Sequence, residues 1–462
     1  MDKAAVILTA GKSTRMKSDI PKALHPILGK PLISHIIDNC KSAGFERIIL
    51  VVGHKAELIK EKLGDKFEYV EQGEPKGTAH ALLATKEILK DFKGVIFTIY
   101  GDVCLVPPEI IKDMVKRHME TKAQCTLLSA DLPGTIYGKI IRDEEGKVKE
   151  ILEPRGLELP PELESICEIN AGVYLFEAPL IFDYLEKIGN DNPQREYYLT
   201  DVVGLLYKDG YNTQAIKLPE SWMAKGINDR KDLVEVEKIM KEKLIERLLR
   251  EGVTIEDPQN TYIEATVEIE RDVTVHPFTF IKGKTKIAKG CEIGPFSHIE
   301  NCEIGEGTKV VASFLQETKI GRNCCIGPFA RLRPGTVLGN EVGIGNFVEV
   351  KNSRIKNGVK AMHLSYLGDA FVGEGTNIGA GTITCNFDGE KKNPTYIGKY
   401  VFVGSDSILI APVEIGDYAY IAAGSVINSN VPSYALGIGR AKQENKEEWV
   451  KKRMEKKKEE QL

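Results

Sequence analysis

The sequence contains no Cys-x-x-Cys pair, and its nine cysteines are scattered along 462 residues. An odd, dispersed set in a long chain is typical of reduced thiols rather than of a disulfide framework or a structural zinc site. Long apolar runs are also missing. The first run, residues 4–10, is far too short for a membrane span, and it leads directly into the polar residues 11–15, which is not the pattern of a signal peptide. We therefore expect a cytoplasmic protein with no membrane partner.

A strong charge of one sign is absent as well. The chain has 63 Lys and Arg against 67 Asp and Glu, a formal net charge of -4. This near balance gives no general reason to bind nucleic acid. The length exceeds that of one ordinary domain, so two or three domains are expected.

Two common phosphate-binding motifs are lacking too. Gly11 and Ser13 flank a lysine as they would in a P-loop, but Val6 stands where that motif needs its first glycine. No Gly-x-Gly-x-x-Gly segment occurs, so the dinucleotide-binding fingerprint is also excluded.

The first part of the chain alternates short apolar runs with amphipathic segments. The apolar runs 4–8, 48–52 and 95–100 are each followed closely by a glycine, and residues 32–43 have a helical pattern. Strands that alternate with helices predict a parallel sheet covered on both faces. We expect a doubly wound α/β domain over residues 1–228.

A single long helix is predicted to follow as a linker over residues 229–251. Leu233, Val236, Met240, Leu244 and Leu248 recur every three or four residues on a charged background. Gly252 stands where a C-terminal cap is expected.

Beyond residue 252 the apolar period changes to six. Aliphatic residues stand at 281, 287, 293 and 299, at every sixth position from 320 to 350, and again from 397 to 427. Such hexads predict a β-solenoid, in which each coil packs on the next, over residues 252–440. The period breaks near 352–371 and 384–396, so we expect both segments to leave the solenoid as loops. Residues 441–462 are expected to form a charged C-terminal tail.

The first candidate site follows the first predicted strand. Residues 8–16 read Leu-x-Ala-Gly-x-x-Thr-Arg-Met, and Pro21-Lys22 come soon after. Backbone amides at a turn that opens a helix can bind phosphate. Asp102 ends a later strand, at the sheet edge where ligands bind. With a phosphate beside it, Asp102 is expected to bind Mg²⁺.

The second candidate site is a histidine among cations. His363 lies at the first break of the hexads, and Asn386 at the second. The cations Arg333, Lys351 and Lys392 accompany them. Three cations and several amides around one base suit an anionic amino sugar.

The first motif resembles that of the sugar-1-phosphate nucleotidyltransferases. Over residues 3–450 the chain is similar to the bacterial bifunctional GlmU family, most closely from Gly327 to Arg440. The resemblance implies a nucleotidyltransferase domain followed by a left-handed parallel β-helix of hexapeptide repeats. It implies synthesis of UDP-N-acetylglucosamine in two steps. Acetyl-CoA first acetylates glucosamine-1-phosphate, and UTP then uridylates N-acetylglucosamine-1-phosphate, releasing pyrophosphate. It also implies a homotrimer assembled through the β-helix.

For the first reaction site, the resemblance implies that Arg15 and Lys22 bind phosphates, that Gln72 reads the base, and that Asp102 and Asn228 hold Mg²⁺. The full set of nucleotide- and sugar-binding residues that it implies is Leu8, Thr9, Ala10, Gly11, Arg15, Lys22, Gln72, Gly77, Thr78, Tyr100, Gly101, Asp102, Gly138, Glu153, Asn170 and Asn228.

For the second site, the resemblance implies that His363 is the general base that deprotonates the sugar amine, a task that suits histidine near neutral pH. The implied ligands of the amino-sugar phosphate are Arg333, Lys351, Tyr366, Asn377 and Lys392. The implied acetyl-CoA residues are Ala380, Asn386, Phe387, Ser405, Ala423 and Arg440.

Several residues depart from the family pattern. Thr9 and Ser13 replace Ala and Gly in the phosphate loop, Ile136 replaces a Gly, Pro154 replaces a polar residue and Phe387 replaces Tyr. Two other functions therefore stay open. One is a nucleotidyltransferase for another sugar or base, whose solenoid acetylates an amino-sugar phosphate or serves only assembly. The other is a trimer that binds sugar nucleotides without turnover.

Overall fold

The computed structural model describes residues 2–11, 13–154, 161–192 and 194–460. The lysine between Gly11 and Ser13 lies outside the described residues. The chain divides into two compact units, residues 1–243 and 244–462, between Lys243 and Leu244. This division falls inside helix α9 (Arg230–Arg250). The domain boundaries drawn from the sequence at 228, 251 and 440 stay a prediction.

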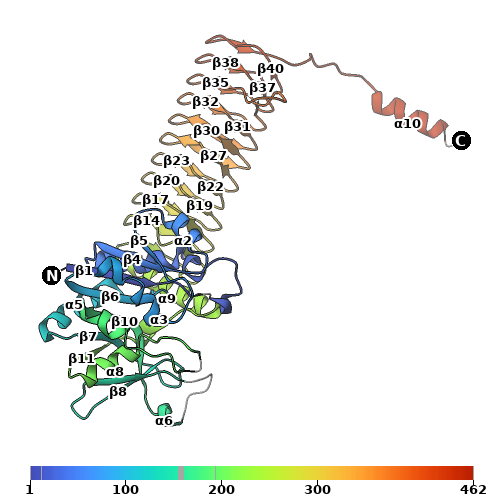
Figure 1. The fold of residues 1–462 in the computed structure, drawn as a ribbon. Coiled ribbons are helices and arrows are strands. Elements are labelled where there is room, and N and C mark those ends of the chain that lie inside the picture. Colours follow the sequence, from blue (N-terminus) through green and yellow to red (C-terminus); the bar gives the residue numbers. More distant parts are fainter. Residues whose placement is uncertain (1, 12, 155–160, 193, 461–462) are drawn as a thin grey trace. The chain divides into compact units, whose positions relative to one another are not determined.

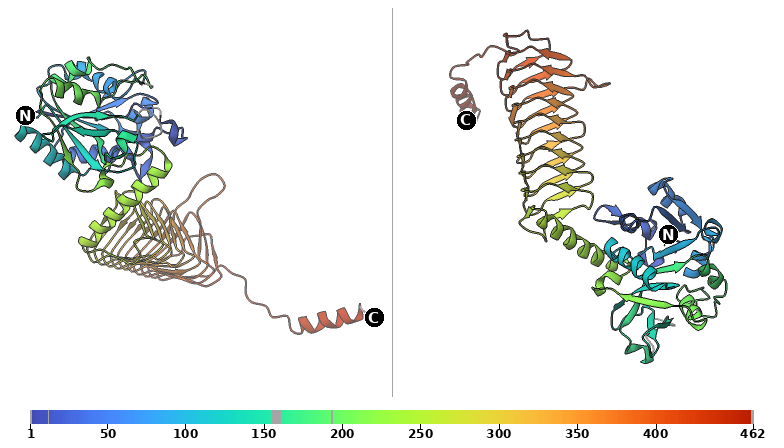
Figure 2. Two further views of the ribbon diagram at one scale, coloured as in Figure 1. Left: turned by 90° about the horizontal axis from the view of Figure 1, so that it is seen from below. Right: turned by 90° about the vertical axis from the view of Figure 1, so that its left-hand side faces the viewer.

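The first unit is built on a nine-stranded sheet with the main order β11-β7-β10-β6-β1-β4-β5 (Figures 1 and 2). Its strands are β1 (Asp2–Leu8), β4 (Arg47–Val52), β5 (Glu68–Glu71), β6 (Gly94–Tyr100), β7 (Cys125–Asp131), β8 (Lys139–Arg142), β9 (Val148–Leu152), β10 (Glu168–Glu177) and β11 (Thr213–Lys217). The expected parallel pairing holds for β1 with β4 and β6. Strand β10, however, runs antiparallel to β6 and β7, so the sheet is mixed.

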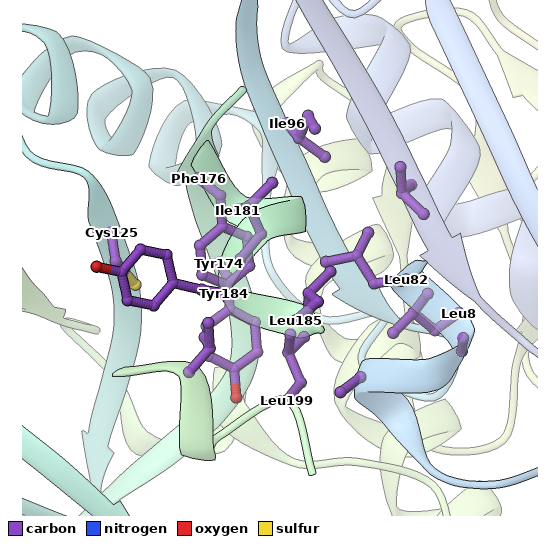
Figure 3. Packing of buried hydrophobic residues seen from close by; sticks show 14 of the residues in the cluster. Leu8, Leu82, Ile96, Cys125, Tyr174, Phe176, Ile181, Tyr184, Leu185 and Leu199 are labelled. Carbon is purple, nitrogen blue, oxygen red and sulfur yellow. The ribbon is translucent and has the colours of Figure 1, made fainter. Parts of the chain in front are cut away.

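Helices cover the sheet, and two of their groups are defined by packing: α1 against α5, and α3, α7 and α8 around one apolar core. The helices of this unit are α1 (Leu32–Ser42), α2 (Ala56–Leu63), α3 (Thr78–Leu83), α4 (Lys86–Leu89), α5 (Pro108–Thr121), α6 (Pro161–Glu164), α7 (Leu180–Leu185) and α8 (Asp201–Lys208). Figure 3 shows that core, with Tyr174 and Phe176 of β10 beside Ile181 and Leu185 of α7. Residues of β1 and β6 are buried on both faces, which explains their uninterrupted apolar sequence.

The second unit is a left-handed parallel β-helix of hexapeptide coils, whose triangular outline is visible in Figure 2. Each coil adds one strand to each of three parallel sheets. Sheet I runs from β12 (Thr254–Ile255) to β41 (Leu436–Gly437), sheet II from β13 (Tyr262–Ile263) to β40 (Val426–Ile427), and sheet III from β14 (Glu268–Ile269) to β38 (Val413–Ile415). Inward aliphatic residues such as Ile281 and Ile293 are 0% exposed, as the hexads predict.

The expectation that 352–371 leaves the solenoid is wrong. This segment continues the coils as β29 (Arg354–Ile355), β30 (Lys360–His363), β31 (Tyr366–Gly368) and β32 (Ala370–Val372). The inward residues Val350 and Ile355, and again Leu367 and Val372, are separated by five positions and remain buried. A corner one residue shorter therefore shifts the phase of the pattern without breaking the coil. An excursion does occur around 386–394, where Phe387 bridges to Lys392.

No helix in the described ranges is both long enough and apolar enough to cross a bilayer. All nine cysteines are free. At the C-terminus, α10 (Trp449–Glu459) has no buried residue.

Candidate functional sites

The carboxyl ends of β1 and β6 border a cavity of about 400 Å³. Its lining includes every residue predicted for the first site except Gly138, Glu153 and Asn170. The two strand ends are joined by Gly101 N–H, which donates to Leu8 O at 2.9 Å. Thr9 N–H donates to Val51 O at 2.8 Å, which anchors the start of the phosphate loop to the sheet.

The sequence suggested that the phosphate loop opens a helix, but the described residues form no α-helix there. Its only helical part among the described residues is a single 3₁₀ turn, Thr14–Met16, flanked by Ser13 and Lys17 in left-handed conformation. Three residues are too few for a useful helix dipole. Positive charge at this edge comes instead from Arg15 and Lys22.

Each of the two predicted metal ligands contacts a different cationic side chain. Lys22 Nζ lies 2.7 Å from Asp102 Oδ2, and these two side chains are 19% and 23% exposed. Arg15 Nη2 donates to Asn228 Oδ1 at 2.9 Å. The ligands are also linked through the backbone, because Ile227 N–H donates to Asp102 O at 3.1 Å. A carboxylate and an amide oxygen that line the same cavity fit Mg²⁺, which takes few protein ligands and keeps waters or phosphate oxygens.

Gln72, which also lines the cavity, is held by two hydrogen bonds. Its Nε2 donates to Gly77 O at 2.9 Å and lies 3.1 Å from His80 Nδ1. Burial lowers the pKa of His80, so the neutral ring can accept this hydrogen bond. Gly77 has φ 105°, and a Cβ there would lie 2.7 Å from the backbone nitrogen of Tyr197. The amide group of Gln72 therefore has one orientation, with its carbonyl oxygen available to a ligand.

The three residues missing from the lining form their own cluster. Asn170 N–H donates to Gly138 O at 2.9 Å, and a Cβ on Gly138 would lie 2.8 Å from Glu153 Oε1. Asn170 Nδ2 donates to the Tyr174 hydroxyl at 2.6 Å, which lies 3.4 Å from the hydroxyl of Tyr100. Tyr100 does line the cavity, so the cluster adjoins it. Burial raises the pKa of the Glu153 carboxyl.

Sequence reasoning missed several lining residues, of which Glu196 is the most polar. Burial raises the pKa of its carboxyl, and Asn192 holds its backbone through two hydrogen bonds of 2.6 and 3.1 Å. The signal that could have found it is the segment Glu196–Asp201, which resembles a segment of the sugar-1-phosphate nucleotidyltransferases that also follows the one around Asn170. The other missed residues are Ser13, Thr14, Pro21, Ala23, Pro75 and Ala81.

The second set of predicted residues lies on the outside of the β-helix. His363 ends β30 in sheet I and pairs in register with Asn346 of the preceding coil; its side chain is exposed. It therefore stands on a regular coil and not at a break in the repeat. In sheet II, Arg333 follows β25 (Arg331–Leu332), and Lys351 ends β28 (Glu349–Lys351) on the next coil. Arg333 Nη1 contacts Glu349 Oε1 at 2.8 Å.

Tyr366 and Asn386 converge over Gly368. A Cβ on Gly368 would collide with the Tyr366 hydroxyl and lie 2.7 Å from Asn386 Nδ2. The Asn386 amide donates to Asp369 Oδ2 at 2.5 Å, and Asn352 Nδ2 donates to Asp369 Oδ1 at 2.5 Å. Asp369, to which the sequence assigned no role, thus holds Asn386 in place.

The remaining predicted residues are spread along the β-helix. Lys392 Nζ lies 4.6 Å from the ring centroid of Phe387 and lines a hollow with Arg354 and Tyr396, whereas Arg333 lines a different hollow with His298 and Phe314. Asn377 begins β33 (Asn377–Ile378) and pairs with Lys360.

The predicted coenzyme residues Ala380, Ser405, Ala423 and Arg440 stand on successive coils. They are linked by backbone hydrogen bonds from Asp406 to Ala380 and from Gly424 to Ser405, both 2.7 Å, and Arg440 Nη1 donates to Ala423 O at 2.6 Å.

Comparison with known proteins assigns each half of the chain. A family model described as nucleotidyl transferase matches residues 4–242. A GMPPB C-terminal domain model matches residues 258–355, and one for bacterial transferase hexapeptide repeats matches residues 394–429. A solved UDP-glucose pyrophosphorylase complexed with UDP-glucose is 21% identical, with a TM-score of 0.43, over 53% of this chain and all of its own. A likeness at that level carries no argument about this chain.

Curated relatives cover nearly the whole chain. The bifunctional protein GlmU of Thermotoga petrophila is 46% identical over 453 residues, 98% of this chain and 99% of the relative. That of a Geobacillus species is 45% identical over 448 residues, 96% of this chain and 97% of the relative. The chain therefore belongs to the GlmU family of bifunctional enzymes, which make UDP-N-acetylglucosamine with a uridyltransferase and an acetyltransferase domain.

Proposed function

We propose that the cavity at the ends of β1 and β6 binds UTP and N-acetylglucosamine-1-phosphate with Mg²⁺, and that the surface around His363 acetylates glucosamine-1-phosphate from acetyl-CoA. One observation carries the first assignment. Two cations, Lys22 and Arg15, contact two oxygen donors, Asp102 and Asn228, in the lining of a cavity of about 400 Å³.

In the uridyl site, Asp102 and Asn228 would hold Mg²⁺, which when bound neutralises phosphate charge. Lys22 and Arg15, which contact these oxygens in the structure, would then be available to the phosphates. Uridyl transfer needs positioned positive charge more than covalent chemistry, and the two cations of the cavity can supply that charge.

The rest of the cavity supports a pyrimidine nucleotide and a sugar. The free carbonyl oxygen of Gln72 can accept the N3–H of uracil, because its amide nitrogen is already committed to Gly77 and His80. Gly138, Glu153 and Asn170 offer a carboxylate and an amide to sugar hydroxyls. Gly138 provides the space, because a Cβ there would press on Glu153.

In the acetyl site, His363 takes a proton from the sugar ammonium, whose free amine attacks the thioester carbonyl of acetyl-CoA and expels the CoA thiolate. The exposed ring is accessible to a substrate without any rearrangement of the core. Arg333, Lys351 and Lys392 supply charge for the sugar phosphate, and Tyr366 and Asn377 supply polar contacts. Asn386, Phe387 and the series from Ala380 to Arg440 are proposed to bind the coenzyme.

A homotrimer is proposed because the β-helix exposes an apolar ladder. Phe278, Phe296, Phe329, Phe347 and Leu364 occupy equivalent corners between sheets I and II, and they are 46–64% exposed. The rings of Phe278 and Phe296 stack with their centroids 5.2 Å apart, and those of Phe329 and Phe347 with their centroids 5.4 Å apart. Exposed apolar surface of this kind favours subunit association. A closed ring of identical subunits would bury this surface in every copy. The free cysteines are in keeping with a cytoplasmic location.

A coupled assay tests the proposal. Purified protein is given glucosamine-1-phosphate and acetyl-CoA, and then UTP with Mg²⁺, and both CoA and pyrophosphate are measured. Release of both supports the proposal. Pyrophosphate without CoA would leave the β-helix an assembly module, and neither product would leave a protein that binds without turnover.

A further inference from the structure

The loop that carries Asn228 is held from two sides by side chains that do not line the cavity. On one side, Gly226 N–H donates to the Tyr137 hydroxyl at 3.3 Å. On the other, Asn228 N–H donates to Asp232 Oδ2 at 2.9 Å. Both residues are half-buried, and neither is among the cavity residues.

These two supports belong to different parts of the first unit. Tyr137 directly precedes Gly138 and strand β8, in the segment proposed to contact the sugar. Asp232 lies in the first turn of α9. The N-terminal end of this helix is capped by Asp229, whose Oδ1 accepts hydrogen bonds from the N–H groups of Lys231 and Asp232 at 2.8 and 3.0 Å. The loop is therefore fixed against both the sugar segment and the long helix.

The two residues that precede Asn228 are also held by the protein. Gly226 and Ile227 are buried, and Ile227 N–H is spent on Asp102 O at 3.1 Å. A Cβ on Gly226 would lie 3.7 Å from Asp102 Oδ1 and 3.8 Å from the Tyr137 hydroxyl. Successive amides of the loop thus point to Tyr137, to the backbone of Asp102 and to Asp232. Each fixes one residue of a three-residue loop that ends in a proposed metal ligand.

We infer that Tyr137 and Asp232 are positioning residues for uridyl transfer: a two-point clamp that sets the distance between the side-chain oxygens of Asn228 and Asp102. A metal ion with strict octahedral geometry is sensitive to that distance. Partners that orient ligands change metal affinity even though they touch no metal. The inference rests on the proposed role of Asn228.

The test compares UTP affinity in Mg²⁺ with that in EDTA, by isothermal titration calorimetry on the full chain without sugar phosphate. The gain in UTP affinity with Mg²⁺ reports the metal site without turnover. Asp232→Ala and Tyr137→Phe are each expected to reduce this gain about five-fold, the size of one lost hydrogen bond, with the EDTA value unchanged. Asp232→Asn keeps an acceptor and is expected to retain the gain. Asp113→Ala, which removes an exposed carboxylate paired with Arg117 on α5, is the matched control.

The clamp is overturned if Asp232→Ala and Tyr137→Phe keep the full gain while Asn228→Ala loses it. It is also overturned if both lose affinity equally in EDTA and in Mg²⁺, which indicates general damage. Full gain in Asn228→Ala would instead remove Asn228 from the metal site, and would refute that part of the proposed function separately. Because Tyr137→Phe removes only one oxygen, it keeps the test valid if Asp232→Ala folds poorly.

Discussion

Replacing His363 with alanine is expected to destroy acetyl transfer with almost no effect on the fold. The side chain is exposed, and its coil is held by backbone pairing with Asn346 and by Ser365 Oγ, which donates to His363 O at 2.8 Å. Alanine keeps all of these backbone contacts and creates no cavity. The free energy of unfolding should therefore change by about 0.5 kcal/mol or less, as for other surface substitutions.

The catalytic loss should be far larger. A positioned general base contributes about a hundred- to ten-thousand-fold in rate, or roughly 3–5 kcal/mol in the barrier. CoA release is measured with a thiol reagent, with a blank that lacks sugar phosphate because Cys167 and Cys325 are exposed and react as well. Uridyl transfer by the same protein should be unchanged. Raising the pH should partly restore acetyl transfer, because more of the amine is then already deprotonated.

His276→Ala is the matched control, since His276 also lies on the β-helix and its Nδ1 contacts Glu256 at 2.9 Å. Acetyl transfer by this variant should remain within two- or three-fold of wild type, roughly the effect of a surface substitution. Near-normal acetyl transfer by His363→Ala at neutral pH would refute the assignment of the base. Equal losses in both variants would show that the loss does not depend on a base at position 363.

Four further outcomes are expected. Asp102→Asn should lower uridyl transfer about a hundred-fold or more and spare acetyl transfer; equal loss of both in pyrophosphate and CoA assays would disprove two separate sites. A fragment of residues 252–462 should associate and acetylate, as judged by light scattering and CoA release, whereas a monomeric or inactive fragment would count against an autonomous domain. Gly368→Ala should push aside the side chains of Tyr366 and Asn386 and reduce acetyl transfer at least ten-fold, roughly the effect of losing one polar contact to the substrate. Unchanged kinetics would show that these two side chains need not converge. Burial lowers the pKa of His118 to about 4. The unfolded state then binds more protons between about pH 4 and 6.5, so the free energy of unfolding rises with pH across that window. His118→Gln should reduce the difference in unfolding free energy between pH 5 and pH 7, measured by urea titration, by about 2 kcal/mol. An identical pH dependence in the variant and the wild type would contradict this.

The β-helix was predictable because one aliphatic residue per strand must point inward. The spacing of these inward positions therefore appears in the sequence as an apolar repeat of six residues. The prediction failed where a corner is one residue shorter, as between Val350 and Ile355. A deletion of one residue looks like the end of a repeat, although the inward side chain stays buried. The antiparallel direction of β10 was also missed, since an apolar run carries no information about the direction of its partners.

The gathering of residues at the proposed uridyl site could be predicted in part, for a different reason. Residues 8–15 and 100–102 end neighbouring parallel strands, so the order of the chain alone brings them to one edge. Gly138, Glu153 and Asn170 come from β8, β9, β10 and their ends, and their relation to the cavity depends on the packing of Tyr100 against Tyr174. The Lys22–Asp102 pair could not be foreseen either, because its distance depends on the path of a loop with little regular structure.

The two active sites differ in how much one chain supplies. In the first unit, a single chain lines the cavity and provides the Lys22–Asp102 pair, the Arg15–Asn228 pair and the Gln72 amide that is proposed to read the base. In the second unit, Arg333 and Lys392 line separate hollows, and the proposed coenzyme residues form an open ladder beside an exposed apolar corner. An open ladder excludes little water, and a thioester needs walls to be held against an amine. Neighbouring copies of the β-helix would supply those walls and would cover the exposed phenylalanines at the same time. On the proposed function, assembly is part of the acetyl-transfer site, whereas the cavity proposed for uridyl transfer is lined by a single chain.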